Sequence, residues 1–76
     1  MKYYIIRISD NENHYKYVMT SGSGLHYGAS PDYTRITAFK SKTQAQNIIT
    51  AGCKRDMNFW HDMVVVNENE LVAHIL

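Results

Sequence analysis

A helix with a clear start signal constrains this chain more than any other feature. Ser41 can accept a hydrogen bond from the backbone N–H of Gln44, and Gln44 can reach back to the N–H of Ser41, which is a capping box. Gly52 offers a residue on which a helix can stop. Between these signals, a modest apolar stripe with helical spacing is formed by Ala45, Ile48 and Ile49. The pattern predicts a single helix of about ten residues.

Most of the remaining chain predicts strands and turns. Residues 3–8 and 14–20 alternate between two faces and are rich in β-branched and aromatic side chains, so we expect two strands joined as an antiparallel hairpin through the turn-forming residues 10–13. Residues 20–34 contain three glycines and the only proline, which predicts an irregular loop. Residues 35–39 predict a third strand that runs into the helix.

The C-terminal third leaves two choices open. Residues 63–66 predict a strand, and the alternation in residues 71–75 favours a second hairpin, although Asn67 as N-cap with Glu70 three residues later would instead start a short helix. We favour the hairpin because a run of valines leads into it and few residues follow. Residues 53–62 are interpreted as a loop that can include a one-turn helix. The alternative is that the helix continues through Gly52 as far as His61, at a cost of about 1 kcal/mol for an internal glycine.

The predicted fold is therefore a single α+β domain over residues 1–76. It is a small antiparallel sheet of about five strands with one helix packed on one face, in the order ββ-loop-β-α-ββ. A chain of 76 residues has room for one small core.

The charge and the cysteine and histidine content limit the classes of function that the sequence predicts. The net charge is +1, which by itself selects no class of partner. The single Cys53 excludes an internal disulfide and agrees with a cytoplasmic protein, and no export signal or membrane-spanning segment is legible. The four histidines share no metal-ligand spacing, and no nucleophile–base pattern is present. We therefore expect a protein that is not an enzyme and that has no metal ion or cofactor.

A partner-binding surface is predicted from three features. The loop over residues 20–34 has the tyrosine, serine and glycine content of a contact loop. The outer face of the helix carries no charge, and an exposed tryptophan would be a binding hot spot. The candidate contact residues are His26, Tyr27, Tyr33, Gln46, Asn47 and Trp60.

An alternative function rests on the tyrosines of the first hairpin. Aromatic rings on an open sheet face, flanked by basic side chains, can stack on nucleic-acid bases. Cross-strand packing of the same rings is the competing structural explanation. The candidate nucleic-acid residues are Tyr3, Arg7, Tyr15, Lys16 and Tyr17.

The sequence Phe39-Lys40-Ser41-Lys42-Thr43-Gln44-Ala45, in its order of hairpin, loop, strand, helix and valine-rich strand, resembles small proteins of bacteriophages and prophages of Gram-positive bacteria. Some proteins of that group, including anti-CRISPR proteins, inhibit host defence. The resemblance implies an inhibitor that acts in the host cytosol by contact with a host protein, such as a defence nuclease complex. It carries no functional residue over, because the group shares no site motif. A homodimer formed through an exposed edge strand is compatible with this function and with the alternative.

Overall fold

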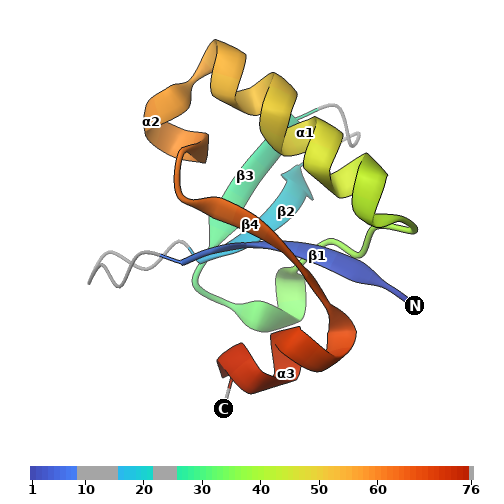
Figure 1. Cartoon of the computed structure of the whole chain (residues 1–76). Helices are drawn as coiled ribbons and strands as arrows, with labels where there is room; N and C mark the ends of the chain where they lie inside the picture. Colours follow the sequence, from blue (N-terminus) through green and yellow to red (C-terminus); the bar gives the residue numbers. More distant parts are fainter. Residues whose placement is uncertain (9–15, 22–25, 76) are drawn as a thin grey trace.

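The computed structural model describes residues 1–8, 16–21 and 26–75, which form an α+β fold (Figure 1). The elements in chain order are β1 (Tyr3–Arg7), β2 (Tyr17–Ser21), β3 (His26–Ser30), the 3-10 turn η1 (Tyr33–Arg35), α1 (Lys42–Arg55), α2 (Met57–Trp60), β4 (Met63–Asn67) and α3 (Glu68–Ile75). The predicted fold class is confirmed, but these residues form four strands and three α-helices rather than about five strands and one helix. None of these helices has the length and apolar character needed to cross a membrane.

The sheet is antiparallel throughout, with the strand order β3-β2-β1-β4. β1 pairs with β4 over its full length, from Tyr3 opposite Asn67 to Arg7 opposite Met63. It meets β2 only at the pair Ile6–Tyr17, next to a 2.8 Å bond from the N–H of Arg7 to the carbonyl of Lys16. The predicted pairing of the first two strands is thus confirmed, while residues 14–15 and the turn at 10–13 lie outside the described residues.

The predicted third strand over residues 35–39 is wrong. β1 and β2 diverge beyond their single pair, and residues 36–39 fill the wedge between them. Thr37 donates its N–H to the carbonyl of Val18 at 3.0 Å, and Phe39 exchanges bonds of 2.7 and 2.9 Å with Tyr3. The third strand is instead β3, within the segment predicted as a loop, where five residues pair in register with β2.

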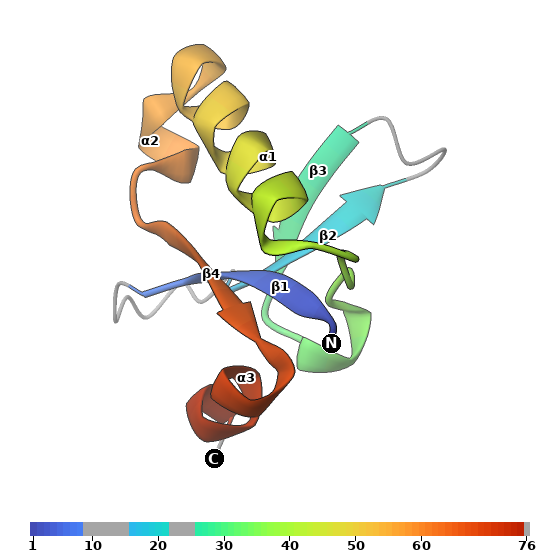
Figure 2. The same ribbon diagram turned by 45° about the vertical axis from the view of Figure 1, so that its right-hand side comes forward.

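Helices cover both faces of the sheet, α1 and α2 on one face and α3 on the other, which corrects the expectation of one covered face (Figure 2). On the face under α1 and α2, the first cluster consists of Ile5, Val18, Phe39, Ala45, Ile49, Trp60 and Met63. On the face toward α3, the second cluster consists of Ile6, Tyr17, Val66 and Leu71. Neighbouring Ile5 and Ile6 are both fully buried because each belongs to a different cluster.

The start of α1 is confirmed and its end is not. Ser41 Oγ accepts from the N–H of Gln44 at 3.0 Å, although Gln44 Oε1 accepts from the N–H of Lys40 at 3.4 Å rather than from Ser41. The helix runs through Gly52 to Arg55, and α2 follows after Asp56. Gly52 is buried, and a Cβ at this position would lie only 2.6 Å from Nε1 of Trp60. Glycine is therefore used here to admit an indole ring instead of to stop a helix.

The predicted C-terminal hairpin is also wrong, and the competing helix is correct. The N–H of Glu70 donates to Asn67 Oδ1 at 2.8 Å, and the N–H of Asn67 donates to Glu70 Oε1 at 3.0 Å. This reciprocal capping box starts α3 directly at the end of β4. Leu71 and Ile75, one turn apart, then face the second cluster.

Candidate functional site

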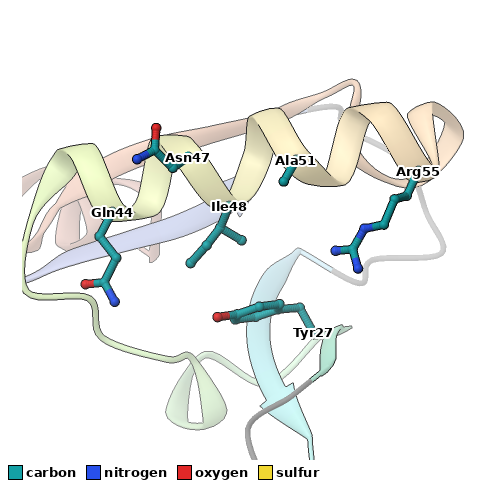
Figure 3. A pocket seen from close by; sticks show the side chains of 6 residues that line it. All are labelled: Tyr27, Gln44, Asn47, Ile48, Ala51 and Arg55. Carbon is teal, nitrogen blue, oxygen red and sulfur yellow. The ribbon is translucent and has the colours of Figure 1, made fainter.

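An open groove of about 420 Å³ runs between one flank of α1 and the edge strand β3 (Figure 3). It is lined by Tyr27, Gln44, Asn47, Ile48, Ala51 and Arg55. The five helical residues recur at intervals of three and four, so they form one stripe about 16 Å long on α1.

The groove exists because α1 packs over β1 and β4 and leaves the face of β3 uncovered. Tyr27 projects from β3 into this space, with its ring centre 6.2 Å from that of Phe39 and 6.3 Å from that of Trp60. Figure 3 shows the ring below Ile48, with its hydroxyl toward the Gln44 end and Arg55 at the other end. A ring held by the core therefore forms the floor of the groove.

The lining is uncharged except for Arg55. Ile48 is half-buried and Ala51 exposed, so apolar surface stays open to solvent, and the amides of Gln44 and Asn47 lie along the helix beside it. The ion pairs among residues 1–8, 16–21 and 26–75 are Arg7–Asp62 at 3.1 Å and Arg35–Asp32 at 3.9 Å, so no described carboxylate neutralises Arg55. The groove thus offers an apolar floor, neutral hydrogen-bonding groups and one cation.

Two of the six predicted partner-binding residues, Tyr27 and Asn47, line this groove together. Gln46 is exposed on α1 but is turned about 100° from Asn47 around the helix. His26 is the first residue of β3. Tyr33 lies elsewhere, in η1, where its ring is 6.4 Å from that of Tyr17.

Trp60 is buried. Only 5% of it is exposed, because its indole packs under α1 against Gly52 and the rings of Tyr27 and Phe59. The exposure that a hot-spot role would require is therefore not found, and the aromatic surface of Trp60 contributes to the first cluster.

The predicted nucleic-acid residues do not share an open sheet face. Tyr17 is only 8% exposed and belongs to the second cluster, whereas Tyr3 packs against the first cluster on the opposite face. Arg7 is fixed by the carboxylate of Asp62 at 3.1 Å and the carbonyl of Phe59 at 2.8 Å. Lys16 is half-buried, and Tyr15 lies outside the described residues.

The 3-10 turn η1 contains a carboxyl group, that of Asp32, with a lowered pKa. Asp32 caps the turn, and its carboxylate accepts from Thr34 Oγ1 at 2.7 Å and from the Thr34 N–H at 3.0 Å. The hydroxyl bond first and the backbone bond second lower the pKa of Asp32 below its usual value. Asp32 is exposed and does not line the groove, so this bonding concerns the local turn.

A second hollow, of about 200 Å³, lies beside the start of α3 and is lined by Tyr3, Lys42, Val65, Asn67 and Glu70. Its side-chain acceptors on Asn67 and Glu70 already take the two bonds of the α3 capping box. Within the described part of the chain, no three His, Cys, Asp or Glu side chains come together as a metal-binding group would. The groove on α1 is therefore the stronger candidate site.

Four of its residues were missed by the sequence-based prediction: Gln44, Ile48, Ala51 and Arg55. They lie three or four residues apart along the helix, in a stripe that includes Asn47. The absence of charge on the outer face did not by itself identify this stripe. No family model, curated protein or solved structure matches the chain.

Proposed function

We propose that this chain is a small non-enzymatic binding protein that inhibits a host defence protein by protein–protein contact through the groove between α1 and β3. The observation that carries the proposal is the exposed, nearly uncharged stripe on α1 above the Tyr27 ring. The choice of a phage-encoded protein and of a host defence target, such as a CRISPR nuclease complex, rests on the resemblance to small phage proteins.

The form of the groove supports a binding role. Its residues come from a long helix and a paired strand, and Tyr27 is packed against two core aromatic rings. A surface that is already ordered loses little conformational entropy when a partner binds. Its apolar centre with amides alongside resembles the composition of protein interfaces, in which charged residues are depleted from the core. None of the lining side chains is a carboxylate, imidazole or thiol that would serve as a general base or nucleophile.

Substitution of Ala51 tests the groove directly. Ala51→Glu places a larger, charged side chain in the groove, and we expect it to abolish inhibition because the partner would have to desolvate that charge. Ala51 is exposed, so the free energy of unfolding should change by no more than about 0.5 kcal/mol. The measurement is phage plating on a Gram-positive host whose CRISPR nuclease blocks infection, with and without expression of each variant.

Thr50→Glu is the matched control for Ala51→Glu. It adds the same charge at the neighbouring exposed position of α1, which does not line the groove. The control should restore plaques as the wild type does. Equal activity of both variants would show that the groove is not the contact surface, and a wild-type protein that restores no plaques would remove the CRISPR nuclease as the target.

Oligonucleotide binding should be weak. The net charge is +1, and Arg7, the cation predicted to flank the stacking rings, is held by Asp62. We expect dissociation constants above about 10⁻⁵ M for single- and double-stranded DNA and RNA at physiological salt, within the non-specific range. Fluorescence titration at several salt concentrations measures this. Sub-micromolar affinity that falls steeply with salt would instead favour a nucleic-acid-binding regulator.

A further inference from the structure

We infer that the partner adds an extended strand to the outer edge of β3 and presents an acidic side chain to Arg55. This inference rests on the proposed function, because it specifies how a protein partner engages the β3 end of the groove.

The open edge follows from the hydrogen bonds of β2. The carbonyl of Val18 accepts from the N–H of Thr37 at 3.0 Å, and the N–H of Thr20 donates to Thr37 Oγ1 at 2.8 Å. Both groups therefore point away from β3. Because backbone groups of successive residues in a strand point to opposite sides, Val18 and Thr20 do not exchange hydrogen bonds with Ala29 and Tyr27, the residues opposite them.

It follows that Tyr27 and Ala29 direct their N–H and C=O groups outward, beyond the last strand of the sheet. Among the described residues, these groups have no recorded backbone or side-chain partner. Unpaired backbone groups on an edge strand are a template for another strand, which would lie about 4.8 Å away. Addition of a strand in this way is an established mode of peptide recognition.

The other edge of the sheet is less suited to this. β4 lies under α1, and its last residue, Asn67, already donates its N–H to Glu70 in the α3 capping box. β3 carries no covering helix on its groove face. A strand added at β3 would therefore border the open groove and Arg55, which a strand added at β4 would not.

Charge selects an acidic partner segment. Arg55 is exposed in the last turn of α1, has no described ion-pair partner, and in Figure 3 its guanidinium extends toward the backbone end of the Tyr27 side chain. A side chain on the helix-facing side of an added strand would approach this guanidinium. Carboxylates bind guanidinium groups through short, charge-assisted hydrogen bonds, so the expected segment carries Asp or Glu at that position.

The probe is a displayed library of random heptapeptides, selected on the whole protein. Selected peptides should share an acidic residue, and Arg55→Gln should weaken their binding by about tenfold or more. Lys54→Gln is the matched control, since it removes the same charge from the adjacent helical position, which does not line the groove, and should leave binding unchanged. Amide hydrogen exchange of Tyr27 and Ala29 should be fast in the free protein and slow at least tenfold in the complex, while that of Gly28, which bonds to β2, should not change.

Several results would overturn the inference. Peptides that bind without slowing the Tyr27 and Ala29 amides would refute strand addition, and so would failure to select any peptide; in either case loss of plaques with Ala51→Glu would still support the groove as a contact surface. If the Arg55→Gln variant bound the selected peptides as tightly as the wild type does, the proposed contact between Arg55 and an acidic side chain would be refuted. Protection of the same amides that rises with protein concentration alone would identify a second copy of this chain as the occupant of the edge.

Discussion

Gly52→Ala is expected to destabilise the protein, although alanine is the better helix former. In an exposed helix interior the change would gain about 1 kcal/mol. Here the new Cβ would lie 2.5 Å from Cδ2 and 2.6 Å from Nε1 of Trp60, far inside van der Waals contact. The indole contacts the rings of both Tyr27 and Phe59, so a shift of the indole would disturb these two contacts as well. Overpacking of this kind costs about 1–3 kcal/mol, and we expect a net loss in urea unfolding.

Removing the Trp60 ring tests whether its contact with position 52 causes the destabilisation by Gly52→Ala. In a Trp60→Leu background the aromatic ring is absent and the smaller, flexible side chain can turn away from position 52, so the same Gly52→Ala change should become neutral or stabilising. A double-mutant cycle of the four proteins measures this coupling. An alanine variant that is more stable than the wild type in the presence of Trp60 would mean that the helix and the indole are not packed as described.

Leu71→Ala should cost about 2–4 kcal/mol, because it removes the main contact between α3 and the second face of the sheet. Leu71 is only 7% exposed and packs with Ile6, Tyr17 and Val66. Since a domain of 76 residues has a stability of only a few kcal/mol, a loss of this size should unfold a measurable fraction at 37 °C. Urea unfolding followed by circular dichroism gives both the free energy and the helix content.

Val72→Ala serves as the control for Leu71→Ala. Val72 is the next residue on α3 and is 53% exposed, so its truncation should change stability by no more than about 0.5 kcal/mol. If truncation of Val72 lowered the free energy of unfolding more than truncation of Leu71, α3 would have to face the sheet through Val72. That result would contradict the packing described for Leu71.

The sequence predicted features that depend on neighbouring residues and failed where distant residues decide. The Ser41 cap is a bond over three positions, so the sequence contains all that is needed to find it. Gly52 can either end a helix or admit a large ring, and the choice depends on where Trp60 packs. Leu71 and Ile75 fit both a strand period of two and a helix spacing of four, so their pattern could not separate the hairpin from α3.

The formation of β3 also depends on residues that are distant in the sequence. His26–Ser30 contains no β-branched residue and includes Gly28, so its own strand propensity is low. It becomes a strand because five residues of β2 are available in register. Conversely, Ile36 and Thr37 favour extended structure, but the divergence of β1 and β2 leaves room for only one bridge, at Phe39.

Two of the six residues of the candidate site were predicted from the sequence. Tyr27 and Asn47 followed from composition, and the rest of the stripe can be generated from Asn47 by helical spacing. Which flank of α1 stays open is set by its packing over β1 and β4, and no local pattern contains that information. The burial of Trp60 and Tyr17 is likewise a property of the two clusters and not of the residues themselves.

The pairing of β1 with β4 has a consequence for how the chain acquires its structure. It joins residues near the start of the chain to residues near its end, with Tyr3 opposite Asn67. Such distant contacts require the entropy of a long loop to be lost before they contribute, which slows folding. On the ribosome, Ile5 and Ile6 emerge well before β4 and α3, and they remain without these contacts until that later segment has been synthesised. The domain is therefore expected to fold after its last helix emerges, in one cooperative step, and the two isoleucines are its most aggregation-prone residues until then.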